Sequence, residues 1–138
     1  PIIMASHLQP YGPGGEGSSS GQCIQTETVL QGRGVMVKLT ALLKRPDGVS
    51  KEEFRRWWLE EHTLLARRFP GLRRYVVSLA MDKPLGEPAY EGFSELWFDS
   101  VEALQKAFAA PEMAPTLEDV RKHVKEVVRL VTVEHEIV

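Results

Sequence analysis

The chain has 138 residues, of which 43% are hydrophobic and 26% are charged, and its 17 basic and 19 acidic residues leave a formal net charge of -2. This length and composition are typical of one globular domain with a modest core. The near-neutral balance argues against the strong positive field of a general nucleic-acid-binding protein, so no nucleic-acid partner is expected.

Cysteine content and hydropathy indicate the cellular compartment in which this protein is expected. The single cysteine, Cys23, cannot form an intrachain disulfide, which favours a reducing compartment. No run of about 18 apolar residues is present, so no membrane partner is expected. The chain also lacks a basic segment followed by an apolar stretch, the pattern of a secretory signal. We therefore expect a cytoplasmic protein.

Residues 1–35 differ in composition from the rest of the chain. The stretch 11–21 is almost entirely Gly, Ser and Pro, and it offers too little apolar surface to offset the entropy lost on ordering. We expect an N-terminal extension over 1–35 that is either flexible or docked on its own domain or on a partner chain. Three origins stay open for it: native sequence, a misplaced start and non-native sequence. Residues 36–138 then form one domain.

The first strong periodic pattern is the alternation of apolar and polar residues over 36–44, which predicts a strand. Ser50 and Glu53 then form a capping box, which begins a helix that runs to about Arg68. Apolar residues recur at helical spacing on one side of this helix: Phe54, Trp57, Trp58, Leu64, Leu65 and Phe69.

Strands and helices continue to alternate over the rest of the chain. Strands are predicted over 72–80, over 93–98 and over 124–138, where β-branched residues dominate. A helix capped by Asp99 follows the third strand, and a short helix from Thr116 to His123 precedes the last one. The order βαββαβ predicts an α+β, ferredoxin-like fold: a four-stranded antiparallel sheet with two helices on one face.

Both faces of the predicted sheet are apolar. In the third strand Leu96 and Phe98 point to one face, and Phe93 and Trp97 point to the other. Two helices cover only one face, and monomers rarely expose a broad apolar surface. We therefore expect a homodimer in which two such faces pack around a cavity and form a dimeric α+β barrel. The alternative is a monomer whose second face is covered by residues 1–35.

Five segments, taken together and in order, resemble a known family. They are residues 37–46, 50–62 (SKEEFRRWWLEEH), 69–71, 74–75 and 90–100 (YEGFSELWFDS). This set is similar to the EthD family of the dimeric α+β barrel superfamily, over nearly all of residues 36–138 and none of residues 1–35. One departure is the acidic pair Glu118-Asp119, where the family pattern is expected to read Asp-Glu.

The resemblance implies a fold and a dimer, together with a range of activities. Relatives with this fold include cofactor-free monooxygenases, lactone isomerases, decarboxylases or cyclases of polyketide-like aromatics, and haem-binding enzymes. We therefore expect a small-molecule-binding protein that works as a cofactor-independent enzyme, of the oxygenase, isomerase or decarboxylase type, on an apolar or aromatic compound in the dimer cavity. A non-catalytic ligand-binding module and a dimerisation module are the alternatives, because a fold does not choose among functions.

His62 is the leading candidate for catalysis. It lies on the apolar side of its helix, four residues after Trp58 and eight after Phe54, and it matches the helix-borne histidine of the EthD family. An imidazole exchanges protons near neutral pH and can serve as a general acid or base. The alternatives are a structural histidine bonded to a backbone carbonyl and an axial haem ligand.

Five further residues complete the expected site. Tyr75 could orient a carbonyl or aromatic ligand through its phenol. Glu95 could act as a base on an apolar inner face, with an intersubunit ion pair as its alternative. Trp58, Phe93 and Trp97 are expected to bind substrate. No metal and no cofactor is expected, since the chain lacks Cys/His ligand spacings and nucleotide-binding or GxSxG motifs.

Overall fold

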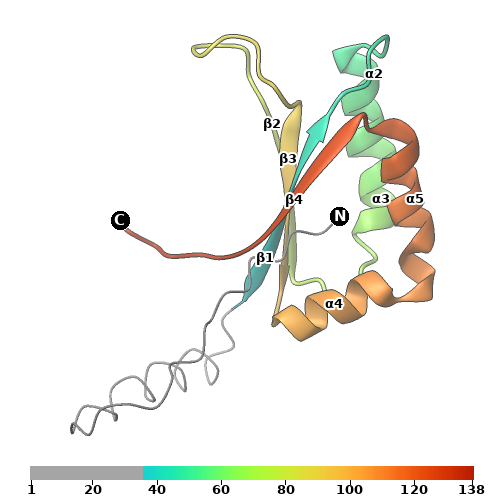
Figure 1. Ribbon diagram of the computed structural model, residues 1–138, viewed down its shortest axis with the longest axis vertical. Coiled ribbons are helices and arrows are strands. Elements are labelled where there is room, and N and C mark those ends of the chain that lie inside the picture. The colour runs from blue at the N-terminus through green and yellow to red at the C-terminus, as the bar shows by residue number, and fades with distance from the viewer. Residues whose placement is uncertain (1–35) are drawn as a thin grey trace, which may run out of the picture.

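A four-stranded antiparallel sheet forms the centre of the structure, a computed structural model that describes residues 36–138. Its strands, in the order β2-β3-β1-β4, are β1 (Val37–Lys44), β2 (Arg74–Leu79), β3 (Gly92–Phe98) and β4 (Glu126–Val133). The helices of this described part all lie on one face of the sheet (Figure 1), and none of them is long and apolar enough to cross a membrane. The predicted α+β, ferredoxin-like fold is confirmed, whereas the prediction for residues 1–35 lies outside the described residues.

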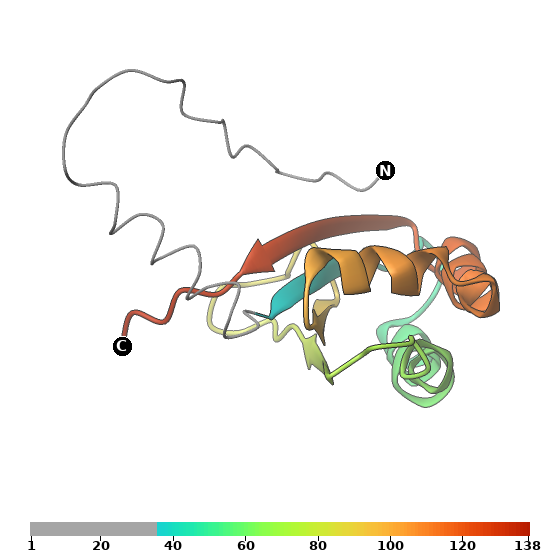
Figure 2. The ribbon, with the colours of Figure 1, turned by 90° about the horizontal axis from the view of Figure 1, so that it is seen from below.

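Strand side chains sort onto two faces of the sheet with a period of two. In β1, Val37, Leu39, Ala41 and Leu43 are buried against the helices, and the residues between them are partly exposed. The pairing register carries this alternation to the neighbouring strands, so helix-facing residues stand in rows across the sheet. The other face carries no helix, as the second view of the molecule shows (Figure 2).

The first helix changes its winding near its middle. Its three parts are α2 (Lys51–Arg56), the π-helical turn η1 (Trp57–His62) and α3 (Thr63–Ala66). The backbone N–H of Thr63 donates to the carbonyl of Trp58, five residues back, as in a π turn. The Thr63 hydroxyl donates to the carbonyl of Leu59 at 2.6 Å. The sequence pattern predicted a single regular helix and did not reveal this wider turn.

The start of this helix agrees with the prediction, and one of its later positions does not. The Ser50 hydroxyl accepts the Glu53 backbone N–H at 3.1 Å, as expected of an N-cap. Phe54 is buried as predicted, but Leu64 is 46% exposed. A π turn takes in one more residue than an α turn, so residues beyond it are rotated relative to Phe54.

The second helical arm is broken into three parts: α4 (Val101–Ala109), η2 (Pro111–Met113) and α5 (Ala114–His123). Two predicted caps are wrong. Ser100, not Asp99, caps α4 by accepting the Ala103 N–H at 3.1 Å, and Asp99 instead pairs with Arg73 at 2.7 Å. Thr116 is not a cap either, because α5 begins two residues earlier and buries Thr116 within the helix.

The last strand ends at Val133, although the sequence predicted that it would continue to Val138. Val133 pairs with Val37, which is the first residue of β1, so the described part of β1 offers no partner to the residues that follow. Ile137 and Val138 are exposed accordingly. Periodicity marks the residues that are able to form a strand, but the length of the partner strand decides how many of them do.

Two clusters of buried side chains fill the space between the sheet and the helices. One contains Phe98 and Met113 beside α4, and the other packs Phe54 and Trp58 of the first helix against Leu43. Burying a side chain of this size contributes about 2 kcal/mol to stability, so the two clusters supply much of the driving force for folding.

We expect Leu39→Ala to lower the free energy of unfolding by about 3 kcal/mol, because Leu39 is 2% exposed in the cluster beside α4 and its truncation leaves a cavity. Leu64→Ala is the matched control and should change this free energy by less than about 0.5 kcal/mol. Urea unfolding followed by tryptophan fluorescence measures both variants. Equal losses in the two would contradict the assignment of Leu39 to the core.

Candidate functional site

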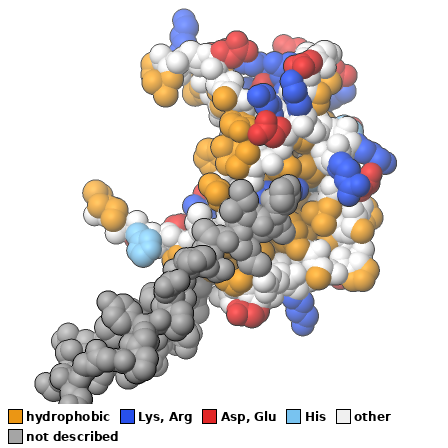
Figure 3. Space-filling model, viewed as in Figure 1, with side chains coloured by type: hydrophobic (Ala, Val, Ile, Leu, Met, Phe, Trp, Pro, Cys, Tyr) orange, Lys and Arg blue, Asp and Glu red, His pale blue; other side chains and the backbone are white. Residues whose placement is uncertain are grey.

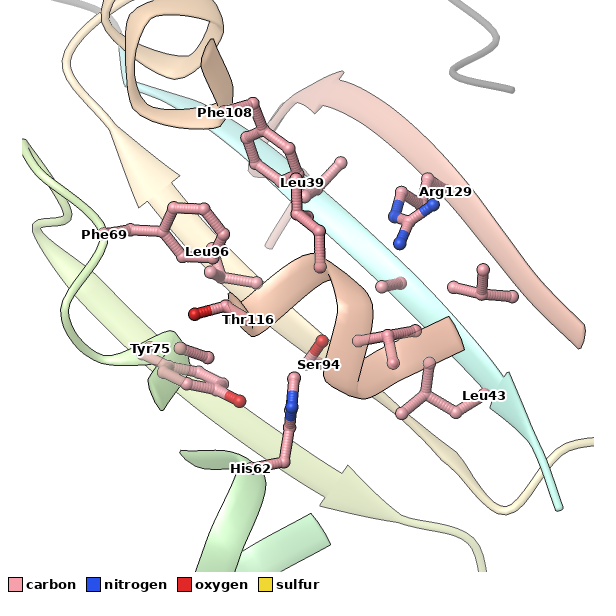
Figure 4. A pocket seen from close by; sticks show the side chains of 15 residues that line it. Leu39, Leu43, His62, Phe69, Tyr75, Ser94, Leu96, Phe108, Thr116 and Arg129 are labelled. Carbon is pink, nitrogen blue, oxygen red and sulfur yellow. The ribbon is translucent and has the colours of Figure 1, made fainter. Parts of the chain in front are cut away.

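A small, mainly apolar pocket lies between the sheet and the helices, lined by residues from both core clusters (Figure 4). Its volume is about 40 Å³, which is room for a few water molecules. Five polar side chains reach it from strands and helices: His62, Tyr75, Ser94, Thr116 and Arg129. An apolar pocket with a few convergent polar groups is the usual form of a small-molecule site.

The centre of the pocket floor is one row of the sheet. Ser94 of β3 pairs with Ala41 of β1, and Ala41 pairs on its other side with Arg129 of β4. The next row along the strands carries the larger Leu96 and Leu39 at the corresponding positions. Because Ser94 and Ala41 are small, the space above them is left open beneath the helices.

His62 closes the π-helical turn and is 6% exposed. Its Nδ1 lies 2.9 Å from Oδ2 of Asp119 on α5. An ionised carboxylate can only accept a hydrogen bond, so Nδ1 carries the proton and Nε2 keeps its lone pair. The ring points into the pocket (Figure 4). His62 is therefore oriented by Asp119 with its basic nitrogen available.

Asp119 connects this buried histidine to one near the surface. Nδ1 of His123, one turn further along α5, lies 2.9 Å from the backbone carbonyl oxygen of Asp119 and 3.1 Å from its Oδ1. The ring of Trp57 stacks on His123 with centroids 4.7 Å apart, and it lies 5.1 Å from the ring of His62. Trp57 therefore packs against both imidazole rings.

Burial lowers the pKa of His62 below its ordinary value of 6.5, and this effect outweighs the opposing hydrogen bond to Asp119. The electrostatic effects of His123 and Arg129 on the pKa of His62 act in the same direction as burial. His62 is neutral at physiological pH as a result, which is the protonation state that a general base needs.

Tyr75 presents its hydroxyl to the same pocket from β2 (Figure 4). Burial raises the pKa of Tyr75 to about 12, so the phenol stays protonated and can donate a hydrogen bond. The indole N–H of Trp58 is near enough to offset part of this rise, but it makes no hydrogen bond. Trp58, which the sequence predicted to bind substrate, is fully buried in its own cluster and does not line the pocket.

Glu95, Phe93 and Trp97 lie on the opposite face of the sheet from His62. They alternate along β3 with residues such as Ser94, which is buried and faces the helices. The six residues predicted for the site are therefore not brought together in one subunit, because the sheet separates these three from the pocket.

Two of these three residues make contacts of their own on that face. Glu95 forms an ion pair with Lys38 at 2.7 Å within the chain. The indole N–H of Trp97 donates to Glu134 at 2.7 Å, and the guanidinium of Arg74 lies over its ring, 4.6 Å from the centroid. These contacts occupy Glu95 and Trp97 without involving the pocket.

Two residues of the pocket region were missed by the sequence reasoning, although each had a signal. Asp119 belongs to the acidic pair in which the chain departs from the expected family pattern. Arg129 is the only charged residue within the run from Val127 to Val133. Neither signal identified a neighbour of His62, because that depends on how α5 and β4 pack against the first helix.

Two further kinds of ligand can be compared with the described residues: a metal ion and haem. Within residues 36–138, no group of three or more His, Cys, Asp or Glu side chains is arranged to hold a metal ion. The haem alternative for His62 does not fit the space beside it, because a cavity of about 40 Å³ is far smaller than the macrocycle.

The chain is similar to a protein-family model and to several solved protein structures. A family model described as the EthD domain matches residues 46–126. The structure of an ethyl tert-butyl ether d (EthD) family protein from Bacillus halodurans C-125 is 31% identical, with a TM-score of 0.66 over 72% of this chain and 99% of that chain. No curated protein matches the chain.

Two more distant structures share the fold. A dimeric protein of unknown function with a ferredoxin-like fold, from Bacteroides fragilis, is 18% identical, with a TM-score of 0.57 over 72% of this chain and 96% of that chain. SnoaB, a cofactor-independent oxygenase from Streptomyces nogalater, is 15% identical, with a TM-score of 0.57 over 74% of this chain and 95% of that chain. At these identities the likeness establishes the fold alone.

The lowered pKa of His62 predicts a pH dependence of stability. The unfolded chain binds more protons than the folded chain between the two pKa values, so the contribution of neutral His62 is complete above 6.5 and is lost as pH falls through the folded-state pKa. We expect the free energy of unfolding to fall from about pH 7.5 to about pH 5, and to fall less steeply in His62→Gln.

Urea unfolding at several pH values measures this difference. His135→Gln, in the exposed C-terminal segment, is the control and should keep the slope of the wild type. The same slope in His62→Gln as in the wild type would contradict a depressed pKa at His62.

Proposed function

This chain belongs to the EthD family, and from that premise we propose that it binds a small apolar or aromatic compound in the pocket between its sheet and helices and acts on it by cofactor-independent acid–base chemistry of the oxygenase, isomerase or decarboxylase type. The observation that carries the proposal is the buried His62, held by Asp119 at 2.9 Å and aimed into the pocket. Perturbed ionisable groups in apolar pockets are the usual mark of such sites.

His62 is the proposed general base. Its Nε2 takes a proton from the bound compound, and the imidazolium that forms is stabilised by the carboxylate of Asp119 across the Nδ1 hydrogen bond. Burial keeps the imidazole neutral before the step, so the base is ready at neutral pH. Asp119 also fixes the ring orientation, so its part is to position and stabilise rather than to contact the compound.

Tyr75 is the proposed hydrogen-bond donor. With its pKa raised to about 12, the phenol keeps its proton and can donate to a carbonyl or phenolic oxygen that gains charge as His62 removes the proton. Phe108 and Leu117 line both the pocket and a larger hollow outside it. A compound larger than a few water molecules would enter by displacing these two side chains.

An interaction module without turnover is the second candidate. The small cavity, about 40 Å³, favours it, since such a space is close to a filled core. In that function His62 would stabilise the packing of the first helix against α5 through Asp119.

The His62→Gln variant separates these two candidates. We expect it to keep the melting temperature within a few degrees and to lose turnover by at least about 100-fold on any aromatic compound that the wild type converts in air, because the base is removed. Asp119→Asn should lose a comparable factor, because an amide favours the wrong imidazole tautomer. Product formation followed by mass spectrometry provides the measurement.

The exposed His123→Gln is the control and should keep most of the activity. An unfolded His62→Gln would favour the structural role of the histidine. A wild type that binds members of an aromatic panel and forms no product would favour binding without catalysis.

A homodimer through the face of the sheet without helices is part of the same proposal. This face carries Phe93, which is 37% exposed, together with Leu130 and the partly exposed Leu42, Val76 and Val128. Hydrophobic side chains gather on this side of the molecule, between the β2–β3 loop and the C-terminal segment (Figure 3). The related fold from Bacteroides fragilis is described as dimeric, which supports this arrangement.

In this dimer Glu95 and Trp97 belong to the interface rather than to the pocket. The Lys38–Glu95 pair lies among the apolar residues of that face and would be shielded from water by the partner subunit. Phe93 would pack against the partner in the same way. Three residues predicted for a site would therefore serve association.

We expect Phe93→Glu to produce monomers at micromolar concentration, because a charge in the centre of an apolar interface stays unpaired. Leu85→Glu is the matched control, since Leu85 is 95% exposed in the β2–β3 loop, and it should remain dimeric. Sedimentation velocity distinguishes the two states. A wild type that sediments as a monomer would contradict the dimer proposal, and so would a Phe93→Glu variant that stays dimeric.

A further inference from the structure

Arg129 has an unusual position for a charged residue. Within the described residues it is the only one of the Lys, Arg, Asp and Glu side chains that lines both the pocket and the hollow beside it. It stands in the middle of β4, opposite Ala41, on the face that the helices cover. The close view shows its guanidinium on the opposite side of the pocket from the ring of His62 (Figure 4).

The guanidinium of Arg129 makes no hydrogen bond and no ion pair with any residue of 36–138. Two other partly buried cations are paired: Lys38 with Glu95 at 2.7 Å, and Arg55 with Glu91 at 3.1 Å. A charge withdrawn from water without a partner costs free energy. Burial accordingly lowers the pKa of Arg129, with no acid acting against it. A bound anion would offset this cost.

The hollow outside the pocket favours the approach of an anion. Its volume is about 490 Å³, and its charged lining consists of Arg121, Lys125 and Arg129 against Glu126. Arg121 pairs with Glu118 at 3.4 Å and Lys125 with Asp47 at 2.8 Å, but both pairs lie at the exposed surface. The excess of positive charge raises the local concentration of anions. Apolar side chains are shared by the hollow and the pocket: Phe108, Leu117, Val120 and Val127.

We propose that the compound bound by this site is a small monocarboxylate with an apolar or aromatic body. The carboxylate binds the guanidinium of Arg129, and the body lies over Ser94 and Ala41 toward His62. The inference rests on the proposed function, because it names the substrate class of the same pocket. The planar fork of a guanidinium matches a carboxylate in a bidentate manner. One unpaired cation balances one negative charge, which favours a monoanion.

Matched acids and amides test this proposal on the full chain. Isothermal titration calorimetry compares isobutyrate, benzoate and cinnamate, each with its neutral amide of nearly the same shape. We expect at least one acid to bind about tenfold or more tightly than its amide. Arg129→Met keeps the apolar length of the side chain and removes its charge, so the preference should disappear while the affinity for the amide stays within about threefold.

Two control variants test whether the preference for acids over amides comes from Arg129. Arg121→Gln removes an exposed cation of the same hollow and should change acid affinity by less than about threefold. His62→Gln should keep the preference for the acid, because Arg129 carries it. Loss of turnover and loss of anion preference are therefore separate results, so this proposal and the acid–base proposal can fail independently.

The melting temperature of the ligand-free protein provides a further test. We expect Arg129→Met to raise the melting temperature by a few degrees, because it removes an unpaired and partly buried charge. A lower melting temperature would mean that an acid of the partner subunit or of residues 1–35 pairs with Arg129, and it would overturn the proposal. Equal binding of acids and amides, or a preference kept in Arg129→Met, would do the same. Absence of binding by all six compounds would overturn this proposal as well.

Discussion

The alternation of side chains across the sheet is the constraint on which the rest of the structure depends. Successive residues of a strand face opposite sides, so the pairing register decides what each side holds. Ser94, Ala41 and Arg129 share one row beneath the helices, whereas Glu95 is one residue away and faces the other side. A slip of one residue would exchange the pocket floor with the apolar face that we assign to the dimer. Core, pocket and interface are therefore fixed by the same register.

The pocket occupies the place where the two core clusters meet and packing is incomplete. Polar groups gather there, and two of them are uncharged: His62 is neutral and hydrogen-bonded to Asp119, and Tyr75 keeps its proton. The π-helical turn ends at His62, and wide turns of this kind recur at functional sites. Arg129 is the exception, because nothing in residues 36–138 balances its charge. This unbalanced charge gives the site the proposed preference for carboxylates, which its apolar walls alone would not supply.

Local patterns predicted most of the fold, and they failed where a long-range partner decides. The alternation in β1 and the cap at Ser50 were predicted, because periodicity and capping are properties of neighbouring residues. The cap at Asp99 was wrong because Arg73, distant in sequence, binds that carboxylate and leaves the cap to Ser100. The last strand was predicted too long because the described part of β1 begins at Val37. These two errors lie at element boundaries, where local preference is weakest.

The sequence by itself determined the order of strands and helices, the family resemblance and the position of His62 on an apolar helix face. These features follow from spacing along the chain, which fixes the face that a residue occupies. Only the tertiary structure decided that His62 meets Asp119, 57 residues away, and that Arg129 faces the same pocket while Glu95, Phe93 and Trp97 lie behind the sheet. Spacing does not encode partners across elements, because contacts between distant segments depend on how helices pack on the sheet and on the register of its strands.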